Sequence, residues 1–358
     1  MAIYPKSESD RLVHPDKLEA AVASIFVACG MDRADGGLLA GSLVHADRRG
    51  VHSHGVLRVP DYVRKLTVEG VDPRGRPHLV VDRGAALVVD GGNSMGQIGG
   101  AFAMQKAIGR AGEIGVAFAA VRGSNHCGAM DWFTLMAVEA GMIGLAGTNA
   151  LPTMAPWGGT DKIVGINPLS IALPAAEERP FVLDIAFGAT AHGKIRVYQQ
   201  KGAPIPEGWA FDADGAPTTD AGMALHGLIQ PIGGHKGVGL GMAVGMLSSL
   251  LSGAAYGTEL GNMVDGPRAG MDGHFFAAID VAFFEDLDRF KTRTDAMIRE
   301  VHGSAARSGV ERLYVPGEIE ADFEAAQEAG IVLSAATIDG IVEAAAVVGV
   351  DLSADFER

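Results

Sequence analysis

The sequence predicts a protein of the α/β class, in which a middle domain of alternating strands and helices lies between mainly helical N- and C-terminal parts. Apolar residues recur at helical spacing over the first seventy residues. From residue 78, short runs rich in valine and alanine alternate with helical stretches, and after residue 285 the helical spacing returns. We therefore divide the chain into a helical part at 1–75, an α/β domain at 76–284 and a helical part at 285–358.

The N-terminal part is expected to contain three helices. The first begins near Pro15, because proline is favoured in a first helical turn, and it ends at Gly30. The second ends near Arg48, and the third follows a short loop and stops at Gly70.

The remaining elements follow from the same patterns. Strands are expected at 78–81, 85–92, 116–121, 142–147, 170–174, 181–186 and 274–280. Helices are expected at 101–113, 128–139, 285–302, 316–329 and 335–347. The segment 237–258 carries no charge, but it contains three serines and no second such segment accompanies it. We interpret this segment as a buried core helix and expect no membrane partner.

Composition restricts the class of protein. The net charge is −14 and no basic run occurs, which excludes a typical nucleic-acid partner. The only cysteines, Cys29 and Cys127, offer neither a disulfide framework nor a CxxC motif. The polar N-terminus lacks the apolar core of a secretory signal, so we expect a cytoplasmic protein.

Glycine is frequent, with 50 residues, and it gathers in the runs 91–100 and 232–239. We interpret these runs as loops in which backbone amides can approach a ligand. Neither a GxGxxG motif after a strand nor a phosphate loop is present, so the usual dinucleotide fold is not supported.

The densest polar cluster is HADRRGVHSHGVLR at 45–58. His54 is suited to proton transfer near neutral pH, and Ser53 gives it a hydroxyl neighbour. If a helix begins in this loop, Arg58 lies on the same face as His54 and can hold a carboxylate. Two alternatives stay open: histidines and arginines that stabilise a helix end, or a zinc site formed by His45, His52 and His54 in a metal-dependent hydrolase or lyase.

Two clusters in the middle domain carry further candidates. In VRGSNHCGAMDW, a helix is expected to begin after His126, and its exposed amides suit an anion unless Ser or Asn merely caps it. Cys127 is interpreted as a packing residue rather than a nucleophile. In FVLDIAFGATAHGK, Asp184 interrupts an apolar strand and Lys194 follows it. Both could face a ligand, or be a strand-end carboxylate and a solvated lysine.

Two glycine-containing motifs complete the candidates. His235 and Lys236 stand between glycines before the uncharged helix, where amides and an ammonium group favour a phosphate. Gly317 and Glu318 mark a helix start in VPGEIE, which alone indicates only capping.

Taken in order, these motifs resemble the malate/L-lactate dehydrogenase family that lacks a Rossmann fold. This family also includes sulfolactate and ureidoglycolate dehydrogenases, diketogulonate reductase and cyclic-imine reductases. The resemblance covers nearly the whole chain. It is carried by RRGVHSHGVLR, VRGSNHCGA, TNALPTMAPWGGTDKIVGINPLSIALP, VLDIAFGATAHGKI, IPEGWAFDADGAPTTD, PIGGHKGVGL and HFFAAID.

The resemblance implies a homodimer of interleaved domains, with a non-Rossmann NAD(P)-binding domain around a mixed β-sheet and an active site at the dimer interface. The expected reaction moves a hydride between NAD or NADP and C2 of a small 2-hydroxy or 2-oxo acid. By motif match, His54 resembles the proton donor, Ser53 its hydrogen-bond partner and Arg58 the anchor of the substrate carboxylate.

The resemblance also implies which residues line the cofactor: His126, Asp184, His235, Lys236, Gly317 and Glu318. No metal ligand is implied. Lys194 is expected to act on substrate or cofactor, and it departs from the cyclic-imine reductases, which have an aspartate near this position. The departure at Lys194 weakens the imine-reductase interpretation, and the segment IPEGWAFDADGAPTTD favours the hydroxy-acid branch. Reduction of cyclic imine carboxylates is the alternative.

Overall fold

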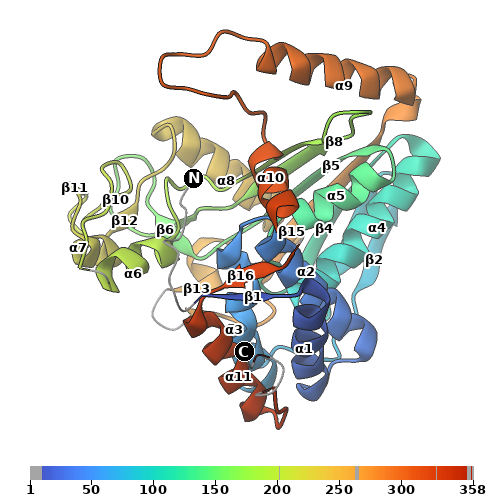
Figure 1. Ribbon diagram of the computed structural model, residues 1–358. Coiled ribbons are helices and arrows are strands. Elements are labelled where there is room, and N and C mark those ends of the chain that lie inside the picture. Colours follow the sequence, from blue (N-terminus) through green and yellow to red (C-terminus); the bar gives the residue numbers. More distant parts are fainter. Residues whose placement is uncertain (1–9, 201, 263–265, 328, 353–355, 357–358) are drawn as a thin grey trace.

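Figure 1 shows the computed structural model, which describes residues 10–200, 202–262, 266–327, 329–352 and 356. The first nine residues lie outside the described residues. The expectation that no secretory signal is present depends largely on them. The assignment of the chain to the α/β class with a mixed sheet is confirmed.

The N-terminal helices pack with the C-terminal end of the chain. The three predicted helices are α1 (Pro15–Ala28), α2 (Arg33–Arg48) and α3 (Val59–Thr67). Helix α11 (Ala335–Val347) contacts α3, and strand β1 (Arg11–Val13) pairs antiparallel with β16 (Ile331–Leu333). Their apolar side chains share one core, so the two ends of the sequence form one packed unit. The division into three parts at residues 75 and 284 stays a prediction.

The main sheet has seven strands in the order β2-β3-β4-β15-β5-β8-β9. Only β3 and β4 run parallel, which makes the sheet mixed. Its strands are β2 (His78–Arg83), β3 (Ala86–Asp90), β4 (Val116–Ser124), β5 (Met142–Thr148), β8 (Leu169–Leu173), β9 (Phe181–Ile185) and β15 (Asp272–Asp280). Strand β15 comes last in the sequence yet lies at the centre, hydrogen-bonded to both β4 and β5.

Helices cover both faces of this sheet. Helices α4 (Gly96–Ile114) and α5 (Asp131–Glu139) contact one face, and α8 (His235–Ser248) contacts the other. Because side chains alternate along a strand, Phe276 of β15 joins the core under α4 while Phe275 joins the core on the opposite face. In Figure 1, α4 and α5 lie to the right of the sheet, and α8 lies to its left.

Smaller elements surround the sheet. They are β6 (Pro152–Met154), β7 (Val164–Gly165), α6 (His192–Gln200), β10 (Ala210–Phe211), β11 (Pro217–Thr218), α7 (Ala221–His226), β12 (Leu228–Ile229), η3 (Gly257–Leu260), β13 (Gly261–Asn262), β14 (Gly266–Pro267), η4 (Val281–Phe283), α9 (Leu287–His302) and α10 (Glu318–Ala326). Figure 1 shows α9 as an outlying helix that a long loop joins to α10.

The predictions for α4 and α8 are wrong in one respect each. Helix α4 begins at Gly96 rather than Ala101, so half of the first glycine run is helix and not a ligand loop. A Cβ atom on Gly100 would lie 2.6 Å from the Phe133 ring, and one on Gly96 would collide with the Asn125 carbonyl oxygen. These glycines therefore allow close packing between α4, α5 and β4.

Helix α8 is not buried all round, contrary to the sequence interpretation. One side, including Val238 and Val244, packs on the sheet. The other side leaves Leu240, Met246 and Leu247 between 41% and 54% exposed. The prediction failed because a helix that is apolar on every side need not be covered by its own chain.

Within the part of the chain that the structure describes, no helix is long and apolar enough to cross a membrane. Cys29 and Cys127 are both buried free thiols. The cytoplasmic location stays a prediction.

Candidate active site

The predicted proton-transfer segment connects α2 to α3. It forms two single turns of 3-10 helix, η1 (His52–His54) and η2 (Val56–Arg58), and α3 begins only at Val59. The continuous helix expected to place His54 and Arg58 on one face does not form. Instead, Arg58 turns back and donates from Nε to the carbonyl oxygen of Ser53 at 2.7 Å.

His54 is held at one ring nitrogen. Its Nδ1 lies 3.0 Å from the Ser53 hydroxyl, which leaves Nε2 for a ligand. The His54 side chain is half-buried. Burial and the nearby positive charge of Arg58 lower the pKa of His54 to about 4, while Asp131 opposes this shift. Without a bound anion, the imidazole is therefore neutral at pH 7.

His126 lies beside His54 and has its own hydrogen-bond chain. The two imidazole rings are nearly parallel, at 12°, with 5.6 Å between their centroids. The buried Tyr62 hydroxyl lies 2.7 Å from His126 Nδ1 and accepts a hydrogen bond from Gln97 Nε2 at 3.0 Å. The Tyr62 proton is thus donated to Nδ1, and we assign the His126 proton to Nε2. Burial lowers the pKa of His126 well below its usual value, so this ring is also neutral.

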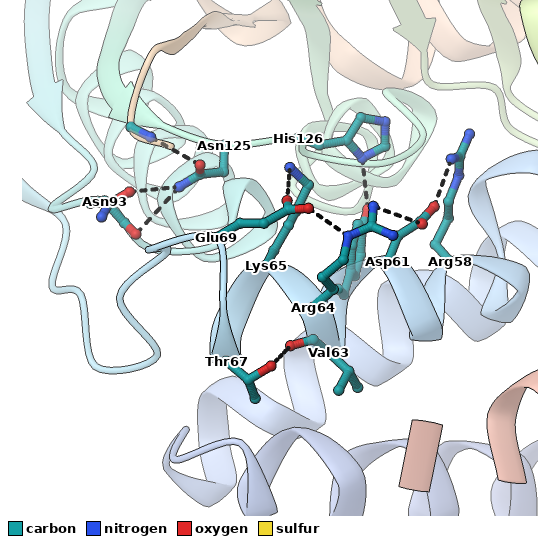
Figure 2. A network of polar contacts seen from close by, with 12 residues as sticks. Arg58, Asp61, Val63, Arg64, Lys65, Thr67, Glu69, Asn93, Asn125 and His126 are labelled. Atoms are coloured by element: carbon teal, nitrogen blue, oxygen red, sulfur yellow. Dashed lines mark hydrogen bonds and ion pairs between the residues drawn. The ribbon is translucent and has the colours of Figure 1, made fainter. Parts of the chain in front are cut away.

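Charged side chains on and beside α3 lie near His126, as Figure 2 shows. Asp61 lies between Arg58 and Arg64, at 3.1 and 3.4 Å. Lys65 is almost fully buried, with Nζ 3.7 Å from Glu69. Three cations, Arg58, Arg64 and Lys65, face only two carboxylates, Asp61 and Glu69, so the network keeps a net positive charge that favours an anion.

Asp184 occupies the helix start that was expected to bind an anion. Its Oδ2 accepts a hydrogen bond at 2.9 Å from the backbone amide of Asp131, the first residue of α5. The prediction of exposed amides after His126 is therefore wrong, since a carboxylate from β9 already caps this helix. Asp184 remains exposed on its other side, yet the surrounding protein and the Asp131 charge raise its pKa to about 7.

The other histidines of the dense polar cluster have carboxylate partners. His45 Nε2 lies 3.4 Å from Asp131, which also accepts from Arg49 Nε at 2.7 Å. His52 Nδ1 lies 2.7 Å from Asp47. Among the described residues, no group of three or more His, Cys, Asp or Glu side chains could hold a metal ion.

The glycine-flanked His235 and Lys236 are the first two residues of α8. Gly233 and Gly234 have φ values of 60° and 64°, which turn the chain into the helix. Both His235 and Lys236 are exposed, and Lys194 lies in the first turn of α6. Within the described residues, no hydrogen bond or ion pair joins these three side chains to His54 or His126.

Gly317 and Glu318 form the start of α10 next to β9. Gly317 has a φ of 93°, and a Cβ atom there would lie 2.8 Å from the Val182 side chain. The Glu318 carboxylate is turned inward: it accepts from the Val315 amide at 2.8 Å and lies 2.9 Å from His302 Nε2. Glu318 therefore holds its loop, and a cavity of about 360 Å³ borders Gly317 and Val182.

Sequence reasoning missed three residues of the site. Tyr62 was not among the candidates, although a tyrosine hydroxyl needs a hydrogen-bond partner when it is buried. Gln97 lies within the glycine run. Fully buried His274 on β15 bonds Thr148 at 2.7 Å and Ser124 at 2.9 Å, and so ties the ends of β5 and β4 together. The sequence signal that could have identified His274 is a histidine at the start of the apolar strand HFFAAID.

Comparisons with known proteins give a consistent result. Residues 13–342 match the family model described as malate/L-lactate dehydrogenase. The chain is 36% identical to a malate dehydrogenase of Pyrococcus horikoshii over 314 residues, which cover 86% of both chains.

Solved structures show the same likeness. The sulfolactate dehydrogenase from Methanocaldococcus jannaschii superposes with a TM-score of 0.90 at 34% identity, covering 97% of this chain and 100% of that one. The Δ1-piperideine-2-carboxylate reductase from Pseudomonas syringae pvar. tomato has a TM-score of 0.83 at 30% identity, with 93% and 99% covered.

Proposed function

Because the chain belongs to the malate/L-lactate dehydrogenase family, we propose that it moves a hydride between a nicotinamide cofactor and C2 of a small 2-hydroxy or 2-oxo acid. The acid is of the malate, lactate, sulfolactate or ureidoglycolate type, as in the names of its relatives. The observation that carries the proposal is His54, held at Nδ1 by Ser53 beside the Arg58 guanidinium.

The chain supplies acid–base chemistry and binding. In the direction of reduction, protonated His54 gives its Nε2 proton to the oxygen on C2, while Arg58 holds the substrate carboxylate. Oxidation uses the reverse steps, with neutral His54 accepting the hydroxyl proton. Ser53 keeps the imidazole oriented. The bound nicotinamide supplies or accepts the hydride.

The residues present fit a dinucleotide. His126 offers an Nε2–H donor beside His54, and the glycine turn before α8 offers amides together with Lys236 for a phosphate. We propose that Asp184, His235 and Gly317 also line the cofactor, with Glu318 acting through the loop it holds. Lys194 is proposed to face substrate or cofactor. NAD and NADP are both compatible with this donor set.

We propose a homodimer whose second subunit covers the exposed side of α8. Leu250 and Leu251, just after this helix, are 57% and 56% exposed, and they continue its apolar face. Light scattering is expected to give a dimer for the wild type. The variant Leu250→Glu should weaken it, and a monomeric wild type would overturn this part of the proposal.

The experiment that tests the reaction is absorbance of the reduced nicotinamide with NADH and NADPH against oxaloacetate, pyruvate and sulfopyruvate, with malate and ureidoglycolate in the oxidative direction. We expect turnover on one of these acids. In Arg58→Ala, KM for the acid should rise and kcat fall, with Arg58→Lys as the conservative variant. Silence on every acid would contradict the proposal.

A second candidate is reduction of cyclic imine carboxylates, which the structural likeness to the piperideine-2-carboxylate reductase favours. Lys194 weighs against it, since the imine reductases have an aspartate near this position. Piperideine-2-carboxylate therefore belongs in the same panel, and turnover on it alone would replace the first proposal.

A further inference from the structure

The proton-transfer segment is fixed by a carboxylate that lies outside the proposed catalytic group. Asp47 is the second-last residue of α2, and its side chain is only 1% exposed. One oxygen, Oδ1, lies 2.7 Å from His52 Nδ1. The other, Oδ2, accepts a hydrogen bond from the Val56 backbone amide at 2.6 Å. Asp47 thus bridges the residues on either side of Ser53, His54 and Gly55.

The same carboxylate explains why a glycine follows His54. Gly55 has φ −88° and ψ −156°, a backbone conformation that other residues adopt readily. A Cβ atom there, however, would collide with the Asp47 carboxylate. A glycine is therefore required at position 55, because the Asp47 carboxylate occupies the space that a side chain would need.

The C-terminal part supports this arrangement from behind. Gln327 Nε2 donates to the carbonyl oxygen of Asp47 at 3.3 Å, and the His52 ring lies edge-on to Phe323 of α10, with 5.8 Å between centroids. Asp47 and His52 are thus both contacted by the C-terminal part, which restrains the position of the Asp47 oxygens.

We propose that Asp47 is a positioning residue for proton transfer: its two oxygens clamp His52 and Val56 and thereby orient His54 toward the substrate. The inference rests on the proposed role of His54. Small displacements of a reacting group cost on the order of 10²-fold in rate. An amide at position 47 has one acceptor oxygen instead of two, so its contact with the Val56 amide or with His52 Nδ1 must change.

The test compares Asp47→Asn with Asp295→Asn. Asp295 is an equally buried carboxylate, accepting from the amides of Ala176, Glu177 and Glu178, but it lies on the outlying helix α9. Both variants should lose stability. Only Asp47→Asn should lower kcat, on the order of 10²-fold, with little change in KM for the cofactor. Equal kcat in the two folded variants would overturn the inference.

Further variants keep the test decisive if Asp47→Asn does not fold. Gly55→Ala retains the Asp47 carboxylate but pushes it out of position, and it should also lower kcat. His52→Gln retains a donor for Asp47 and should keep more activity than His52→Leu. Equal rates for the two His52 variants, with unchanged kcat in Gly55→Ala, would overturn the inference.

A readout without turnover separates this inference from the proposed function. The His54 ring resonances, assigned by their loss in His54→Ala, should shift in Asp47→Asn and stay unchanged in Asp295→Asn. Unshifted resonances in Asp47→Asn would overturn the positioning role even if the enzyme turns over the acids. A shift in a protein that turns over none of them would support the clamp while the proposed function fails.

Discussion

The two groups of proposed site residues differ in how completely the chain surrounds them. Around His54, donors and acceptors are joined to one another: Ser53, Tyr62 and Gln97 each make a hydrogen bond within the group. At the start of α8, His235 and Lys236 project from an exposed turn. Acid–base groups need fixed geometry before the ligand arrives, whereas phosphate-binding groups can close on the ligand as it binds. Different substitutions should therefore damage the two regions in different ways.

The largest effect is expected in the enclosed region. His54→Ala should lower kcat by about 10²- to 10⁴-fold, because proton transfer to the substrate oxygen is lost, with a smaller change in KM. Steady-state kinetics with the acid identified in the panel measures it. The exposed His78→Ala serves as control. Near-normal turnover in a folded His54→Ala protein would contradict the assignment of proton transfer to His54.

The buried His274 of the central strand β15 should make the protein less stable in acid. Burial lowers the pKa of His274 to about 4 from 6.5, so the unfolded chain binds the proton more tightly. The stability contributed by the neutral ring is present above pH 6.5 and is lost as the pH falls toward 4, on the order of 2–3 kcal/mol. Urea unfolding at pH 7 and pH 4.5 measures this loss, which should be smaller in His274→Gln. An equal loss in both proteins would contradict it.

The exposed region should affect binding rather than folding. Lys236→Ala is expected to raise KM for the cofactor by about 10- to 100-fold, as for a hydrogen bond to a charged group, while thermal stability stays unchanged. Lys236→Arg should retain much of the affinity. A loss of stability without any change in KM would mean that Lys236 belongs to the fold and not to the site.

The smallest effect is expected from Tyr62→Phe, which removes only the hydroxyl that fixes the His126 tautomer. A net hydrogen-bond contribution of about 1 kcal/mol predicts a two- to tenfold weaker cofactor affinity. Tyr198→Phe, at a ring that packs on Trp209, is the matched control. Equal cofactor affinities in the two variants would show that the role of His126 does not depend on its hydrogen bond with Tyr62.

Local sequence patterns predicted most helices and strands. They could not predict contacts between residues that are far apart in the sequence. Helices α1, α2 and α11 follow from apolar spacing, because that spacing is itself what packs them together. The cap on α5 could not be predicted, because the carboxylate comes from Asp184 on another strand. Likewise, Tyr62 and His126 are 64 residues apart in the sequence, so their hydrogen bond forms only in the folded chain.

The motif containing His54 was found from residue types alone, but its geometry was not. Spacing suggested a helix linking His54 to Arg58, while the chain instead forms two short turns and uses the Arg58–Ser53 hydrogen bond. The reason lies at Asp47, whose carboxylate takes the Val56 amide that an advancing helix would need. A buried side chain nine residues away therefore decides the local backbone.

The central position of β15 has a consequence for synthesis on the ribosome. Strands β4 and β5 are complete by residue 148, but the strand that separates and pairs with them ends only at residue 280. Until then, the nascent chain holds two apolar strands whose facing edges lack their partner, a state that favours association with other chains. The sheet can therefore be completed only after residue 280 has been synthesised, and a chaperone that shields nascent chains should raise the yield of active protein.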